Sequence, residues 1–118
     1  MKILHRATGA ELFSDGSDSL KTTLENAIRR GAYLGGAYLE GAYLRGADLA
    51  ISAGWPNGWH AFGWLKDKSI YVQVGCRNLS LAEGREYWAG KDDRREVLAA
   101  LDYIETVAKL RGWEIKES

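Results

Sequence analysis

Apolar residues follow three different spacings along this chain, and each spacing predicts a different kind of structure. From Leu20 to Ile28 they recur at i, i+4, i+7 and i+8, which is typical of one face of an amphipathic helix. From Ser69 to Val74 they alternate along the chain, as in a half-buried β-strand. From Ala32 to Ile51 they recur every five residues, which matches neither a helix nor a strand. The middle segment therefore needs a separate explanation.

The residues before the repeat predict a hairpin followed by a helix. Residues 2–13 contain two short apolar runs with Gly9 between them, which is a hairpin pattern. Residues 15–19 offer N-caps for a helix, and Gly31 suits the position just after that helix. Residues 1–31 are thus expected to form a hairpin and a capping helix.

The residues after the repeat predict a second hairpin. Residues 52–57 are rich in turn formers and are expected to be a linker. Residues 59–65 and 69–74 should form two antiparallel strands, joined by a turn at residues 66–68.

Two helices are expected after this hairpin. Ser80 and Glu83 have the spacing of a capping box, which predicts a short helix that runs to about Ala89. A longer helix should begin near Asp93 and end at Arg111. Its apolar face would consist of Val97, Leu98, Leu101, Ile104, Val107 and Ala108.

The repeat consists of consecutive five-residue units that begin with alanine and carry leucine at the third position. Leucines at this spacing can stack if the chain turns a corner after each unit. A helix is disfavoured, because each interior glycine costs about 1 kcal/mol relative to alanine. The units are Ala32–Gly36, Ala37–Gly41, Ala42–Gly46 and Ala47–Ile51.

These units resemble the pentapeptide-repeat family, whose members coil into a right-handed, four-sided β-helix. The resemblance implies one coil over residues 32–51, with Tyr33, Tyr38 and Tyr43 pointing outward. The expected fold is therefore α+β: one coil of a right-handed quadrilateral β-helix, flanked by the elements of residues 1–31 and 52–118, in one compact domain. A single coil leaves two open strand edges, which must be covered by these elements or by another copy of the chain.

The residues after the repeat are also similar to segments of small phage and prophage proteins that follow short pentapeptide runs. The similar segments are residues 74–77, 81–88, 100–105 and 111–113. The resemblance implies a viral setting, in the cytoplasm of an infected or lysogenic bacterium, but no activity.

Charge and hydropathy restrict the class of function. The chain has 118 residues, and its 16 basic and 16 acidic side chains give no formal net charge. A protein that binds duplex nucleic acid would show a basic stripe, and a mimic of DNA would need strong negative charge, as in longer pentapeptide proteins that bind DNA gyrase. Neither class is expected. No apolar run approaches 18 residues and no signal segment is visible, so we expect no membrane span.

Catalytic and metal sites find little support in the sequence. Cys76 is the single cysteine, and His5 and His60 are the two histidines. Their spacing matches no pattern of metal ligands. An enzyme that pairs Cys76 with His60 is a third-ranked hypothesis, and we expect no catalytic residue, metal or cofactor.

Tryptophans gather between residues 54 and 65, with His60 and Phe62 among them. They could fill the core of a small sheet, or they could stack on a base, a sugar or a protein surface. Arginines further along could bind the phosphate of such a ligand. The mixed charges of residues 91–95 are interpreted as a solvated helix start. The candidate ligand-binding residues are Trp55, Trp59, His60, Trp64, Arg77 and Arg85.

Two functions follow from these observations. The first is a small, non-enzymatic binding protein of phage type that associates with itself or with a host protein, for example to inhibit host defence. Its interface would use Tyr33, Tyr38 and Tyr43, because tyrosine gives a large contact area at a low entropic cost. The alternative for these tyrosines is packing on the flanking helices and the second hairpin. The alternative is a protein that binds or sequesters a small nucleotide through the tryptophan-rich segment.

Overall fold

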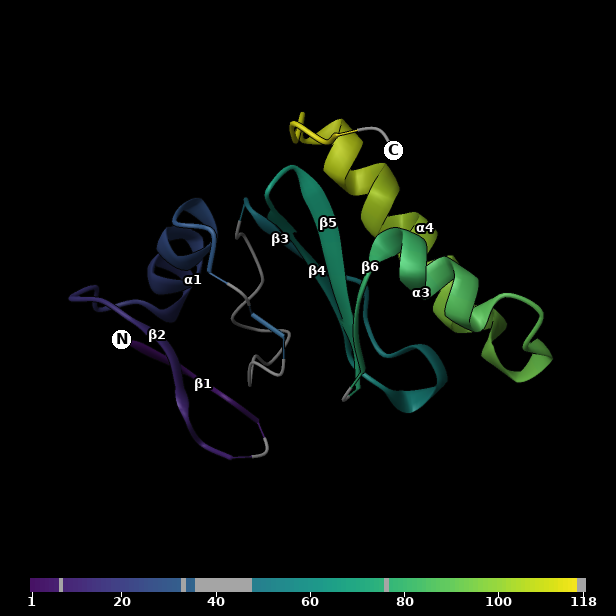
Figure 1. Cartoon of the computed structure of the whole chain (residues 1–118), viewed down its shortest axis with the longest axis horizontal. Helices are drawn as coiled ribbons and strands as arrows, with labels where there is room; N and C mark the ends of the chain where they lie inside the picture. The colour runs from purple at the N-terminus through teal and green to yellow at the C-terminus, as the bar shows by residue number, and fades with distance from the viewer. Residues whose placement is uncertain (7, 33, 36–47, 76, 117–118) are drawn as a thin grey trace.

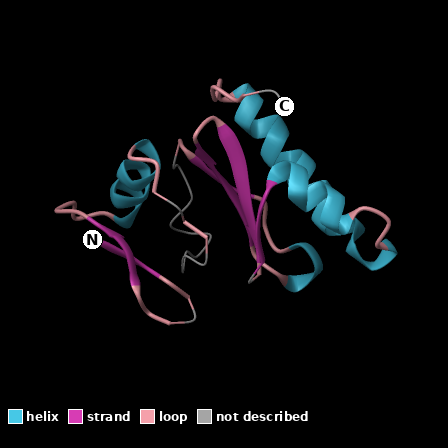
Figure 2. Ribbon diagram, in the orientation of Figure 1, coloured by secondary structure: helices cyan, strands magenta, loops and turns pink. Residues whose placement is uncertain are grey.

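The structure is a computed structural model that describes residues 1–6, 8–32, 34–35, 48–75 and 77–116 (Figure 1). Within these residues it contains three α-helices, a two-stranded antiparallel sheet and a four-stranded antiparallel sheet (Figure 2). The α+β class is therefore confirmed. The elements are β1 (Lys2–Leu4), β2 (Glu11–Ser14), α1 (Leu20–Arg29), β3 (Ala50–Ser52), β4 (Ala61–Lys66), β5 (Ser69–Val74), β6 (Arg77–Ser80), α3 (Leu81–Trp88) and α4 (Arg95–Leu110), with short 3-10 turns η1 (Pro56–Gly58) and η2 (Asp92–Arg94).

The N-terminal hairpin and helix form as the sequence predicts. β1 and β2 pair with Ile3 opposite Phe13, and Gly9 takes a φ of 72° in the connecting turn. The hydroxyl of Ser19 accepts a hydrogen bond from the backbone of Thr22 and caps the start of α1. Gly31 has a φ of 73° just after the helix, a conformation that favours glycine.

Both faces of the four-stranded sheet are covered. Along β4, Phe62 and Trp64 point toward the N-terminal hairpin and α1, whereas Ala61 and Gly63 point toward α4. The cartoon shows the same arrangement, with α1 on one side of the sheet and α3 and α4 on the other (Figure 1). The strand predicted at residues 59–65 is thus present, although β4 begins at Ala61 and not at residue 59.

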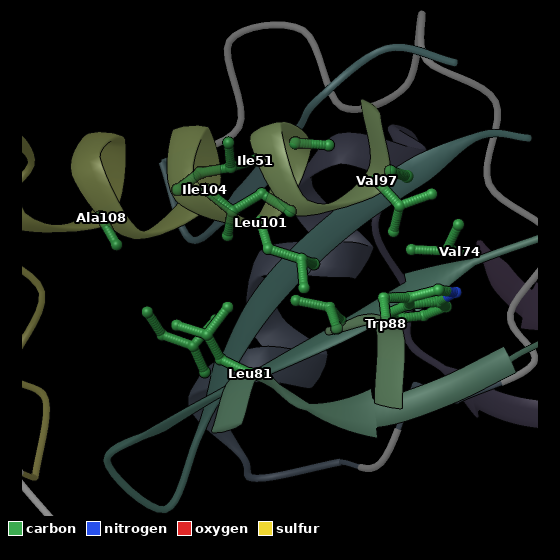
Figure 3. Packing of buried hydrophobic residues seen from close by; sticks show 12 residues of the cluster. Ile51, Val74, Leu81, Trp88, Val97, Leu101, Ile104 and Ala108 are labelled. Atoms are coloured by element: carbon green, nitrogen blue, oxygen red, sulfur yellow. The ribbon is translucent and has the colours of Figure 1, made fainter. Parts of the chain in front are cut away.

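The face that carries α3 and α4 holds the larger apolar cluster. Val97, Leu101 and Ile104 of α4 project onto this face, next to Leu81 and Trp88 of α3 (Figure 3). The capping box predicted at the start of α3 is present, with hydrogen bonds in both directions between Ser80 and Glu83. The periodicity of the last helix therefore predicted its buried face correctly.

Two strands were not expected. β3 pairs with β4, placing Ile51 opposite Gly63, and β6 pairs with β5, placing Val74 opposite Arg77. Residues 50–52 thus form a strand that crosses residue 51, the predicted boundary between coil and linker. Both strands are short edge strands held by backbone hydrogen bonds, so they need little alternation of apolar side chains.

Most of the five-residue repeat lies outside the described residues. The predicted coil and the outward positions of Tyr33, Tyr38 and Tyr43 fall in this part of the chain. At the start of the repeat, Leu34 is buried with Phe62 in the core between α1 and the sheet.

The end of α4 is tied to the segment that leads into β3. The Arg111 guanidinium donates hydrogen bonds to the carbonyl oxygens of Ala50 at 2.9 Å and Asp48 at 3.3 Å. The indole of Trp113 donates to the same Asp48 oxygen at 3.0 Å. Gly112, with a φ of 75°, turns the chain so that Trp113 can reach back.

None of the helices in the described part of the chain has the length and apolar character needed to cross a membrane.

Candidate functional site: a cationic pocket

A pocket of about 470 Å³ opens where four segments of the sequence meet. These are the turn of the β1–β2 hairpin, the residues just after η1, the turn between β5 and β6, and the segment from α3 to η2. Buried Val74 and Trp88 line its inner wall, and Figure 3 shows these two side chains near each other. Its aromatic residues are Trp59, Tyr87 and Trp88, and its charged residues are Arg6, Arg77, Lys91, Asp93 and Arg94. We call it the cationic pocket.

Glycines shape two walls of the cationic pocket. Gly75 has a φ of 60° in the turn after β5, and a Cβ there would contact Trp59 Cγ at 3.4 Å. Trp59 therefore packs against this turn. Gly90, with a φ of 75°, follows the end of α3 and lets the chain reverse, so that the Lys91 backbone donates to the carbonyl of Trp88.

Aromatic rings hold most of the cations of the pocket. The Arg77 guanidinium lies 4.3 Å and the Lys91 ammonium 4.1 Å from the centre of the Tyr87 ring. The Arg94 guanidinium lies 4.6 Å from the centre of the Trp59 ring. These distances lie within the range of cation–π attraction, which positions a cation and leaves its charge in place.

Only part of this positive charge is neutralised. Arg94 forms an ion pair with Asp93 at 3.1 Å. Arg6 instead donates a hydrogen bond to the backbone carbonyl of Gly75. Among the described residues, no carboxylate forms an ion pair with Arg6, Arg77 or Lys91. The pocket therefore concentrates positive charge in a chain whose formal net charge is zero.

Two of the predicted ligand-binding residues, Trp59 and Arg77, meet in the cationic pocket. Trp59 is 42% exposed, so part of its ring is open to solvent. The sequence interpretation had linked the two residues through a common ligand, and the structure brings them to one site although 18 positions separate them.

The other two tryptophans predicted to bind a ligand, Trp55 and Trp64, do not line this pocket. Rings form a row along the sheet face that α1 covers, with centroid distances of 4.9 Å from Trp55 to His60, 5.6 Å from His60 to Phe62, 5.6 Å from Phe62 to Trp64 and 6.0 Å from Trp64 to Tyr71. Trp64 is fully buried at 0% exposure, so it packs in the core and presents no binding face. Trp55 is 60% exposed at the outer end of the row.

His60 contacts a hydroxyl and two aromatic rings. Its Nε2 lies 3.1 Å from the hydroxyl of Ser52, and its ring packs between Trp55 and Phe62. Cys76, the predicted partner of His60 in an enzyme, lies outside the described residues.

Arg85 is occupied by carboxylates of α4. Its two terminal nitrogens donate to the Glu105 carboxylate at 3.1 and 2.9 Å, and one of them also donates to Asp102 at 3.0 Å. This fork holds the pKa of Glu105 below its ordinary value. Arg85 therefore joins α3 to α4, and it does not line the cationic pocket.

Sequence reasoning missed most of the cationic pocket. It interpreted residues 91–95 as a solvated helix start, but Lys91 and Arg94 line the pocket together with Tyr87. Gly90 before Lys91 was a usable signal, because a glycine after a helix reverses the chain direction. No local signal marked Arg6, which reaches the pocket from a distant hairpin.

No protein-family model, curated protein or solved structure matches the chain.

Proposed function

We propose that the protein is a non-enzymatic binding protein for a phosphorylated ligand that contains a planar ring, such as a nucleotide. The observation that carries this proposal is the cationic pocket, where Arg6, Arg77 and Lys91 lie next to exposed aromatic rings without carboxylate partners in the described residues.

The way these cations are held favours an incoming anion. An exposed cation–π contact contributes about 0.5–1 kcal/mol, whereas a hydrogen bond to a charged group contributes about 1.5–3 kcal/mol. Arg77 and Lys91 can therefore turn from Tyr87 to a phosphate with a net gain. The pocket volume of about 470 Å³ also lies within the range of pockets that enclose small ligands.

The lining of the pocket supports binding more than catalysis. Its single carboxylate among the described residues, Asp93, is held by Arg94. A general base needs to be within hydrogen-bond reach of a reacting group and able to take its proton. Asp93 is already paired with Arg94. The other functional groups of the described lining are aromatic rings and cations.

Isothermal titration calorimetry with the four ribonucleoside triphosphates tests the proposal. The wild-type protein should bind at least one of them, and the Arg77→Gln/Lys91→Gln variant should bind it at least tenfold more weakly, which corresponds to about 1.4 kcal/mol. Lys21→Gln on α1 is the control, because it removes one exposed charge outside the pocket. The proposal fails if none of the nucleotides binds, or if the control weakens binding as much as the pocket variant.

We also propose a second function, in which the protein is of phage type and associates with itself or with a host protein, for example to inhibit host defence. In this proposal the pentapeptide coil and its tyrosines supply part of the interface. It is supported by apolar exposure on α4, where Tyr103 is 52% and Leu110 80% exposed. These residues are seven positions apart and so share one helix face.

A further inference from the structure

Resting on the proposed function, we infer that the ligand is a nucleoside polyphosphate, with its base on Trp59 and its phosphate chain across Arg6, Arg77 and Lys91. The juxtaposition of one partly open indole ring with cations from three separate segments carries this inference.

The number of cations indicates more than one phosphate group. A phosphate monoester carries about −1.5 to −2 charges at pH 7. Arg6, Arg77 and Lys91 together exceed this charge, and none of them has a carboxylate partner among the described residues. A diphosphate or triphosphate chain would neutralise them, whereas a single phosphate would leave positive charge uncompensated.

The origin of the cations indicates an extended anion. Arg6 comes from the β1–β2 turn, Arg77 begins β6, and Lys91 follows α3. Arg77 and Lys91 both contact the Tyr87 ring, whereas Arg6 is held at the carbonyl of Gly75. Cations distributed around the pocket in this way suit a chain of phosphates that crosses it.

Trp59 provides the surface for the base. It lies against Gly75, next to the backbone carbonyl that holds Arg6, and its ring is covered by Arg94. The Arg94 guanidinium can leave the ring and keep its ion pair with Asp93 at 3.1 Å. A base that replaces it on the indole would gain the stacking contact that aromatic residues give to nucleobases.

Arg6 also makes the N-terminal hairpin part of the binding site. The hairpin packs on α1, and Arg6 connects it to the turn after β5, 69 positions away in the sequence. A phosphate chain bound to Arg6 and Arg77 at once would join the hairpin to the four-stranded sheet. Amide hydrogen exchange in β1 and β2 should therefore slow when the ligand binds.

The decisive experiment compares a nucleoside triphosphate, the matching monophosphate and inorganic triphosphate by calorimetry. We expect the nucleoside triphosphate to bind at least tenfold more tightly than the monophosphate and than inorganic triphosphate. Trp59→Leu should weaken the nucleoside triphosphate about tenfold and leave inorganic triphosphate unchanged. Arg6→Gln should reduce the preference for triphosphate over monophosphate and abolish the slowing of exchange in the hairpin.

Matched variants separate ligand contacts from folding. Trp55→Leu removes an exposed tryptophan outside the pocket and should not alter binding. Trp59→Phe keeps a ring and should retain more affinity than Trp59→Leu.

The outcomes distinguish this inference from the proposed function. If no nucleotide binds, the proposed function itself fails. If the monophosphate binds as tightly as the triphosphate, or inorganic triphosphate binds as tightly as the nucleotide, the proposed function survives and the polyphosphate inference is wrong. Tighter binding of a single-stranded oligonucleotide than of the nucleoside triphosphate would also overturn the inference.

Discussion

Asp15 connects the turn before α1 to the body of that helix. Its carboxylate accepts hydrogen bonds from the Asn26 amide at 2.8 Å, from the Thr23 hydroxyl at 2.7 Å and from the Ser17 backbone at 3.0 Å. These bonds, the Asn26 bond foremost, hold the pKa of Asp15 well below its ordinary value of 3.8.

The depressed pKa of Asp15 predicts a specific acid sensitivity. A carboxylate of this kind stabilises the folded chain above its ordinary pKa, and the stabilisation is lost as the pH falls through the lower pKa of the folded state. Asp15→Asn should therefore lower stability at neutral pH and flatten the loss of stability below about pH 4. Urea unfolding at a series of pH values measures both effects. Asp18→Asn, an exposed neighbour, is the control, and an unchanged acid slope in Asp15→Asn would contradict the prediction.

At the scale of elements, Gly63 sets the distance between β4 and α4. A Cβ at this position would lie 2.7 Å from Ile104 Cγ2 and 3.3 Å from the Tyr71 carbonyl oxygen. Such distances require one of the packed elements to move. The absence of a side chain at Gly63 therefore allows α4 to lie directly on the sheet.

Gly63→Ala is expected to destabilise the protein by about 1–3 kcal/mol, the usual cost of inserting a methyl group into a packed core. Thermal or urea unfolding gives the value. Gly16→Ala is the matched control, because a Cβ there meets no atom within 4 Å. The added cost of Gly63→Ala should shrink in an Ile104→Ala background, and equal costs in both backgrounds would exclude the proposed contact.

Elements with a strong local signal were predictable, and the two edge strands of the four-stranded sheet were not. The capping box at Ser80 and the periodicity of α4 depend on neighbouring residues, so the sequence alone reveals them. β6 depends on backbone pairing with β5, and only one of its residues, Leu79, is apolar.

The difference between local and tertiary signals also explains which residues of the site could be predicted. Trp59 and Arg77 were identified because their side chains suit a nucleotide. Arg85 has the same chemistry as Arg77 but meets the carboxylate of Glu105, and Arg6 enters the pocket only through the folding of the hairpin. Tertiary contacts thus determine which arginine keeps its charge available.

At the scale of the whole molecule, exposed apolar groups on α4 lie away from the cationic pocket. If they form an interface between copies, the solution mass should rise above that of one chain at micromolar concentrations. Leu110→Ser with Tyr103→Ser should lower that mass, because it removes the two large exposed apolar side chains of this helix face. Leu4→Ser, exposed on β1, is the control. If sedimentation equilibrium gives the mass of one chain for the wild type at all concentrations, the proposed self-association is contradicted.

The contact between Arg111 and Ala50 bears on the solubility of the protein. β3 lies at one edge of the four-stranded sheet. Unpaired carbonyl groups at such an edge can form hydrogen bonds with a strand of another molecule. Because the guanidinium already takes the Ala50 oxygen, an incoming strand would have to displace the end of α4 before it could pair there. We therefore expect the Arg111 contact to disfavour strand addition at this edge, and its loss to lower the amount of soluble protein.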